Sequence, residues 1–128
     1  INGGVVEPRV RVGTTTIDTG NNYCTRSSSN GGSGSNALST DDMVTTVSGL
    51  DCPQEIVMWI SNPTDLSKWA CHYSCARSTA GAGTVPQRRW GVSKWSNTTS
   101  QIDIIALFDN SSLTRIANGS QVIVFGAD

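Results

Sequence analysis

The chain has 128 residues, a formal net charge of −1 and only 15% charged residues. A chain of this length can bury a core of its own, so we expect a single domain over residues 1–128. The charge balance excludes a generally basic nucleic-acid binder, and no apolar run reaches the length of a membrane-spanning helix. The chain opens at Ile1 with neither a methionine nor an apolar leader, which leads us to expect a mature secreted chain or an excised domain.

The N-terminal quarter predicts one strand and one long loop. In residues 5–18, valines alternate with arginines before a β-branched run, which favours an edge strand or a hairpin arm. Residues 19–36 are rich in Ser, Asn and Gly and predict a loop. A Val/Thr/Arg edge at residues 9–17 would allow two copies to form a homodimer through a sheet edge.

Two helices and one strand are predicted in the middle of the chain. The first helix would begin at Ser39, whose side chain can cap it, and end at Gly49. Residues 56–60 are continuously apolar and predict a central strand buried on both faces. The second helix would be capped by Asn62. Its core stripe falls at helical spacing and comprises Leu66, Trp69, Ala70 and Tyr73. Trp59 and Trp69 are both assigned to the core.

The C-terminal part predicts strands at residues 102–108 and 122–125, with a further strand near residues 87–95. Residues 110–119 between the first two could form a short helix or a long hairpin loop. This order of elements predicts an α/β (α+β) fold: one compact domain with a mixed sheet of four or five strands packed by two or three helices.

The four cysteines of the chain predict disulfide bonds and therefore a secreted protein. On the predicted helix, Cys71 and Cys75 lie one turn apart, and we expect both to pair outward with Cys24 and Cys52. The partner choice stays open, and a strained bond between Cys71 and Cys75 is the alternative. Each bridge would stabilise the fold by roughly 2–4 kcal/mol. Sequons for N-glycosylation at Asn97, Asn110 and Asn118 also suit a secreted glycoprotein, with occupancy left open.

The densest candidate binding segment is residues 88–95, where basic residues alternate with tryptophans. Indole faces stack on sugars, and Arg and Lys donate hydrogen bonds to hydroxyls and carboxylates. The predicted ligand-binding residues are Arg88, Arg89, Trp90, Lys94 and Trp95. The same pattern suits single-stranded nucleic acid, which the overall charge disfavours. The competing interpretation is that the tryptophans fill the core, and it weighs more heavily on Trp90 than on Trp95.

No catalytic motif is present in the sequence. His72 is the only histidine, and its spacing from Cys71 and Cys75 matches no common zinc pattern. No nucleophile motif accompanies it. We therefore assign no catalytic residue, metal or cofactor, and we lean away from an enzyme.

The sequence resembles small secreted fungal proteins, in particular mushroom glycan-binding and effector-like proteins. The resemblance rests on the start of the chain, its four cysteines, its low charge, and an α/β order in which Trp59-Ile60 leads into Asn62-Pro63-Thr64. It implies a secreted, lectin-like carbohydrate-binding protein that binds a glycan or glycoprotein. A secreted effector or capsid-type protein-interaction domain is the alternative, and a small secreted hydrolase such as a ribonuclease, with His72 as acid or base, is a second one.

Overall fold

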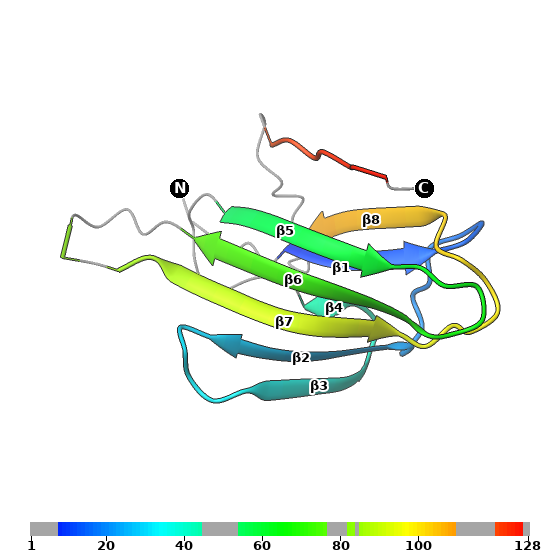
Figure 1. The fold of residues 1–128 in the computed structure, drawn as a ribbon, viewed down its shortest axis with the longest axis horizontal. Helices are drawn as coiled ribbons and strands as arrows, with labels where there is room; N and C mark the ends of the chain where they lie inside the picture. The colour runs from blue at the N-terminus through cyan, green and yellow to red at the C-terminus, as the bar shows by residue number, and fades with distance from the viewer. Residues whose placement is uncertain (1–7, 45–53, 77–81, 84, 110–119, 127–128) are drawn as a thin grey trace.

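The computed structural model of the chain describes residues 8–44, 54–76, 82–83, 85–109 and 120–126. These residues form two antiparallel sheets, one of three strands and one of five, with the core between them (Figure 1). Within the described ranges there is no helix. The predicted α/β (α+β) fold, a mixed sheet packed by helices, is therefore wrong, and the described part of the protein is all-β. No described segment is a helix long and apolar enough to cross a membrane.

The smaller sheet has the strand order β4-β1-β8, and the larger has the order β3-β2-β7-β6-β5. The strands of the smaller sheet are β1 (Pro8–Gly13), β4 (Met43–Val44) and β8 (Ile104–Asp109). The strands of the larger sheet are β2 (Tyr23–Ser29), β3 (Ser35–Thr40), β5 (Gln54–Ser61), β6 (Lys68–Ala76) and β7 (Gln87–Trp95).

The first predicted strand exists, but it does not lie at an edge. β1 pairs with β8 along its whole length and with β4 at Arg9 and Val10. The alternation in its sequence explains this position, because the valines enter the core while the arginines form ion pairs on the other face. There the Arg9 Nη1 atom lies 3.2 Å from the Asp42 Oδ1 atom. The proposed dimer edge at residues 9–17 is therefore wrong for β1.

The helix predicted from Ser39 is also wrong over the part that the structure describes. Ser39 ends up near the end of β3 with a φ of 52°, and Thr40 turns the chain by donating its hydroxyl to the carbonyl of Asp42 at 2.8 Å. Met43 then pairs with Val10 and is fully buried. Residues 45–49 of the predicted helix lie outside the described residues.

The second predicted helix is in fact β6. Its side chains alternate between the two faces of the sheet, with Trp69, Cys71, Tyr73 and Cys75 on one face. β6 pairs with β5 over eight residues and with β7 over nine, so the ladder satisfies its backbone on both sides. This tertiary pairing overrides the helical spacing of residues 66–73, because local propensity is a weak prior.

Strand β2 lies inside the segment predicted to be a loop. Serine and threonine fit a buried strand here because their hydroxyls find partners between the sheets. Thr25 is 3% exposed, and its Oγ1 atom lies 2.7 Å from the Oγ atom of Ser93 on β7. The turn to β3 uses Asn30 and Gly31, whose φ angles of 53° and 77° place both in the left-handed region.

The remaining predictions for strands are partly confirmed. Residues 87–95 and 102–108 correspond to β7 and β8. Residues 56–60 lie in β5, but β5 is an edge strand and is not buried on both faces. Residues 120–126 are described and form no strand, so the strand predicted at 122–125 is wrong in this structure. The helix or loop expected at 110–119 lies outside the described residues.

The buried apolar side chains of the described residues form one core cluster. Its buried members are Val10, Val12, Tyr23, Met43, Ala70 and Trp95. The Tyr23 hydroxyl oxygen accepts a hydrogen bond from the backbone N–H of Val12 at 3.1 Å and lies 2.9 Å from the Val12 carbonyl oxygen. A buried phenol needs such partners, and here they connect β2 to β1 across the two sheets.

Candidate functional site

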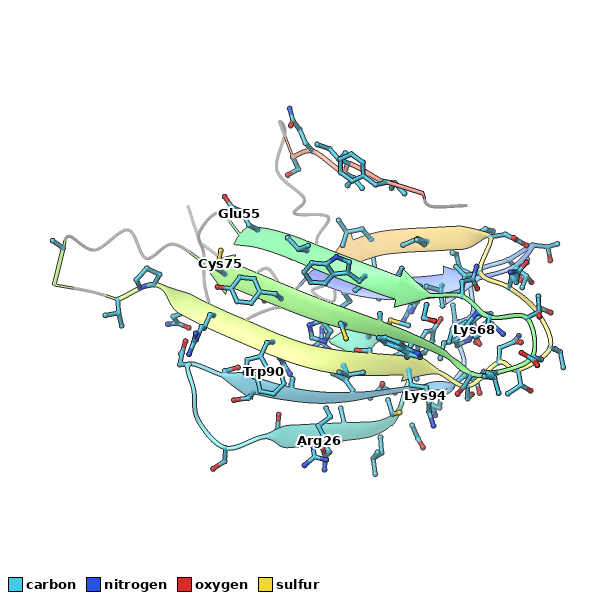
Figure 2. The ribbon with its side chains drawn as sticks, in the orientation of Figure 1. Arg26, Glu55, Lys68, Cys75, Trp90 and Lys94 are labelled. Carbon is cyan, nitrogen blue, oxygen red and sulfur yellow. The ribbon has the colours of Figure 1, made fainter. Side chains whose placement is uncertain are left out.

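Four large aromatic side chains are exposed on one face of the larger sheet, the face turned away from the smaller sheet. They come from β5, β6 and β7, and their exposed fractions are 62% for Trp59, 45% for Trp69, 41% for Tyr73 and 55% for Trp90. We call this surface the aromatic face. Figure 2 looks onto it and labels Trp90 on β7. An exposed cluster of large apolar side chains on a soluble domain is typical of an interaction site.

The strand register places these aromatics next to one another. Tyr73 is directly opposite Trp90 on the neighbouring strand. Trp59 is opposite Cys71, which puts it diagonally next to Trp69 and Tyr73 on β6. Directly opposite side chains have Cβ atoms about 4.5–5.5 Å apart, and diagonal neighbours are still within reach of aromatic rings. The aromatic face is therefore one continuous surface.

Aliphatic side chains complete this surface. Val57 is opposite Tyr73 and is 48% exposed, and Val92 is opposite Cys71 and is 42% exposed. These two valines occupy positions between the aromatic rings. The surface between the rings is therefore apolar.

Charged side chains surround the aromatic face. On the β2 side, Arg26 is opposite Val92, and Lys94 is opposite Trp69. At the far end, Cys75 is flanked by Arg88 on β7 and by Glu55 on β5. All four charged residues are exposed. Figure 2 labels Arg26, Glu55 and Lys94. Among the described residues, three cations against one carboxylate give this surface a positive excess.

The structure separates the five predicted ligand-binding residues into two groups, because successive side chains of a strand point to opposite faces. Arg88, Trp90 and Lys94 lie on the outer side of β7 and are exposed. Arg89 points inward, where its Nε atom donates to the Oγ atom of Ser27 at 3.0 Å. Trp95 also points inward and is only 2% exposed.

The sequence interpretation placed three of the four tryptophans on the wrong side of the sheet, and Trp90 is the exception. Trp59 and Trp69, which were assigned to the core, are exposed, while Trp95 is a core residue. The signal that could have found the aromatic face is the alternation in residues 69–75, where Trp, Cys, Tyr and Cys occupy every second position.

Comparison of the chain with protein-family models, with curated proteins and with solved structures finds no match.

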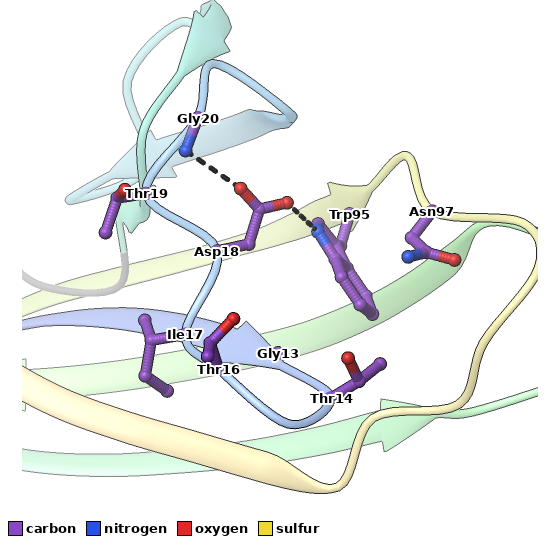
Figure 3. Close-up of a pocket in the computed structure, with 9 residues that line it drawn as sticks. All are labelled: Gly13, Thr14, Thr16, Ile17, Asp18, Thr19, Gly20, Trp95 and Asn97. Carbon is purple, nitrogen blue, oxygen red and sulfur yellow. Dashed lines mark hydrogen bonds between the residues drawn. The ribbon is translucent and has the colours of Figure 1, made fainter.

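A second candidate is a polar pocket of about 360 Å³ beside the loop that follows β1 (Figure 3). It is lined by Gly13, Thr14, Thr16, Ile17, Asp18, Thr19, Gly20, Trp95 and Asn97. The carboxylate of Asp18 is already engaged: it accepts hydrogen bonds from the Gly20 backbone N–H at 2.8 Å and from the Trp95 indole N–H at 2.7 Å. The Asn22 side-chain amide adds another at 2.9 Å. The carboxylate therefore fixes the loop and has little capacity left for a ligand.

These hydrogen bonds also change the pKa of the Asp18 carboxyl. Partial burial of the Asp18 carboxyl acts to raise its pKa, but the hydrogen bonds from Trp95, Asn22 and Gly20 outweigh burial and hold the pKa below its usual value. Asn97, the sequon residue of this pocket, accepts hydrogen bonds at Oδ1 from the backbone N–H groups of Thr99 and Ser100, both at 2.9 Å. Asn110 and Asn118 lie outside the described residues.

The single histidine lies on the opposite side of the sheet from the aromatic face. His72 is 2% exposed, and neither ring nitrogen has a hydrogen-bond partner among the described residues; the same holds for the Oγ atom of Ser74, which is fully buried. Burial, helped by the positive charge of Arg89, lowers the pKa of His72 to about 4. The imidazole is therefore neutral near pH 7 and has no open path to a substrate on the aromatic face.

The cysteines are arranged differently from the predicted helix. Cys71 and Cys75 lie four residues apart on one strand, about 13 Å at the usual rise per residue, which is too far for a bond between them. Cys24, Cys71 and Cys75 are free in the structure, and Cys52 lies outside the described residues. Disulfide pairing that involves Cys52 stays a prediction.

Over the described residues, no three His, Cys, Asp or Glu side chains lie close enough together to hold a metal ion.

Proposed function

We propose that the protein binds carbohydrate on the aromatic face, without chemistry of its own. The observation that carries the proposal is the exposure of Trp59, Trp69, Tyr73 and Trp90 on one face of three adjacent strands. Such rings offer broad, rigid, apolar surfaces with a polar N–H or O–H at one side, which suits the C–H faces and hydroxyls of sugars. The flat arrangement over several strands fits an extended glycan better than a single small sugar.

The surrounding charges indicate the class of glycan. Arg26, Arg88 and Lys94 can donate to hydroxyls and carboxylates. Among the described residues, Glu55 is the one carboxylate that the register places among them. The positive excess favours an acidic glycan, one that carries uronic or sialic acid. The net charge of −1 for the whole chain argues against nucleic acid as the ligand, because phosphate binding needs a broader basic surface.

The arrangement favours binding over hydrolysis. Most glycosidases act with two carboxylates on either side of the scissile bond, and the register places only Glu55 beside the aromatics in the described part of the sheet. His72 lies on the other face of the same sheet. A secreted location, inferred from the cysteines and the sequons, is part of this proposal and suits a glycan ligand.

A glycan array with the purified protein tests the proposal, followed by titration calorimetry with the best acidic oligosaccharide. Replacement of Trp90 or Trp59 by alanine should weaken binding by roughly tenfold each, about 1.4 kcal/mol of lost stacking. The control is Val85→Ala, which changes a side chain that is 80% exposed in the loop before β7. A blank array, or tryptophan variants that bind as the wild type does, would overturn the proposal.

One observation favours a second candidate, the protein-interaction domain. Val57 and Val92 make the surface between the rings aliphatic, and such a surface suits the buried centre of a protein interface. Val92→Lys distinguishes the two functions, because a charge at this position removes apolar contact area from a protein interface while leaving all four aromatics available for sugar stacking.

A further inference from the structure

Over the described residues, the sandwich is open along the side where the edge strands β5 and β8 lie. On β8, Ile105 and Leu107 are opposite Val12 and Val10 and therefore belong to the core-facing side of the smaller sheet. The two valines of β1 are 0% and 5% exposed, but Ile105 and Leu107 are 50% and 37% exposed. Core-facing residues with this much exposure show that nothing in the described part of the chain covers this side.

The larger sheet is also incompletely covered on this side. β5 is the last strand of the larger sheet, and its core-facing Met58 and Ile60 are only partly buried although they pack against the core cluster. The smaller sheet has three strands and the larger has five, and β8 is one of the two edge strands of the smaller sheet. One more strand beside β8 would continue the smaller sheet and cover these side chains.

The edge of β8 is also open to strand pairing. β8 is paired with β1 on one side, and no described strand pairs with its other side. Between Asp103 and Asp109 the sequence is Ile-Ile-Ala-Leu-Phe, without a charged residue or proline. Natural edge strands are commonly protected by such residues, so this edge is suited to accept another strand.

The chain carries a segment that fits this edge. Residues 120–126 are described and belong to neither sheet, and Figure 1 shows them as the red segment beyond β8. Their four consecutive apolar side chains are almost fully open to solvent: Val122 71%, Ile123 71%, Val124 75% and Phe125 90%. β-branched and aromatic residues of this kind favour strands, and an isolated exposed run of them needs a partner.

We propose that Val122–Phe125 of one copy adds as a strand to the β8 edge of a second copy, so that the protein assembles by reciprocal strand exchange. No described residue of the same copy pairs with the donor segment or with the acceptor edge, and a two-fold arrangement satisfies both at once. The backbone ladder supplies affinity, as in other cases of strand addition. Alternate side chains of the added strand then cover Ile105 and Leu107, and the others extend the outer side of the sheet.

The absence of charge supports a like-with-like assembly. Residues 120–126 contain no ionisable side chain, and neither do residues 104–108. No like-charge repulsion therefore opposes contact between two copies of these segments. The assembly surface lies at the β5–β8 side of the sandwich, so the aromatic face of each copy stays available for its ligand.

The oligomeric mass and one charged substitution test the inference. By light scattering or sedimentation, the wild type should have twice the 13.5 kDa mass of one chain, and Val124→Lys should be a monomer at the same concentration. Leu38→Lys is the matched control, because Leu38 on β3 is also 75% exposed in one copy. If the exposure of the replaced side chain alone decided the oligomeric mass, Val124→Lys and Leu38→Lys would change that mass equally.

Hydrogen exchange completes the test. In the wild-type dimer, the backbone amides of residues 122–125 and of β8 should be protected, and both sets should lose protection in Val124→Lys. A monomeric wild type overturns the inference, and protected amides at 122–125 in that monomer would assign the segment to its own β8. A dimer that Val124→Lys leaves intact also overturns it. If Val124→Lys fails to fold, the wild-type mass and amide protection decide alone.

Discussion

The imidazole ring of His72 on β6 lies against Gly91, the residue opposite it on β7. A Cβ atom at position 91 would lie 2.8 Å from the Nε2 atom of His72 and 2.7 Å from the backbone oxygen of Arg26. Glycine is therefore required in the middle of the central strand because the ring of the opposite residue occupies the space of its side chain. This contact closes the inner side of the larger sheet beneath the aromatic face.

We predict that Gly91→Ala destabilises the protein by about 1–3 kcal/mol, because the methyl group must displace either the buried ring or the backbone of β2. Chemical denaturation measures this difference in the free energy of unfolding. Gly83→Ala is the matched control, since no atom lies within 4 Å of a Cβ placed there. Equal stability of the two variants would contradict the close contact of Gly91 with His72.

The buried histidine predicts a loss of stability in mild acid. The pKa of His72 is lowered to about 4 in the folded protein, from 6.5 in the unfolded chain. Between these values the unfolded chain binds a proton that the folded protein does not, so stability is complete above pH 6.5 and declines as the pH falls toward 4. The loss amounts to about 3 kcal/mol at most.

His72→Leu should remove this part of the pH dependence and raise stability at pH 5 more than at pH 7, because leucine fills the site and has no nitrogen without a partner. Since His72 is the only histidine in the chain, the difference between the two stability profiles reports this group alone. Parallel profiles of the variant and the wild type would show that the ring is not buried as the structure has it.

Strands whose own residues carry the pattern of a strand could be predicted from the sequence, and strands that depend on partners elsewhere in the chain could not. β7 and β8 were predicted because their apolar or alternating runs carry the strand pattern by themselves. β2 was missed because serine and threonine signal loops unless partners across the sheet satisfy them, as Ser93 does for Thr25. No pattern within residues 19–36 contains that information.

The aromatic face was missed for a related reason. Trp59 and Trp69 were assigned to the core because burial of an indole is favourable, and only the register of β5, β6 and β7 shows that they share the outer side with Trp90. β6 was predicted to be a helix because three of its apolar residues, together with Leu66 before it, happen to fall at helical spacing. The alternation that makes it a strand becomes informative once its two neighbours are known.

Asp18 predicts a second effect of acid. Its pKa lies below the usual value, so its hydrogen bonds stabilise the folded protein above the unfolded pKa of 3.8, and this contribution is lost as the pH falls through the lower folded value. We expect Asp18→Asn to be less stable than the wild type at neutral pH, with the difference shrinking below pH 3.8. Asp65→Asn, at an exposed position before β6, is the control and should follow the wild type. A difference that does not change with pH would contradict the role of the Asp18 carboxylate in fixing the loop.

The cysteines of β6 provide a test of the fold itself. On a helix, residues four apart have Cβ atoms about 5–6 Å apart and come close to disulfide distance. On β6, Cys71 and Cys75 are about 13 Å apart along the strand, and each is opposite its own neighbour on β5, Trp59 and Glu55 respectively.

We therefore expect disulfide mapping without reduction to find no internal disulfide in the tryptic peptide of residues 69–77, even after mild oxidation of the native protein. Cys75→Ser is the control for labelling, because it leaves Cys71 as the one thiol of that peptide. Detection of a Cys71–Cys75 bond in the native protein would mean that this segment is a helix and that the larger sheet lacks β6.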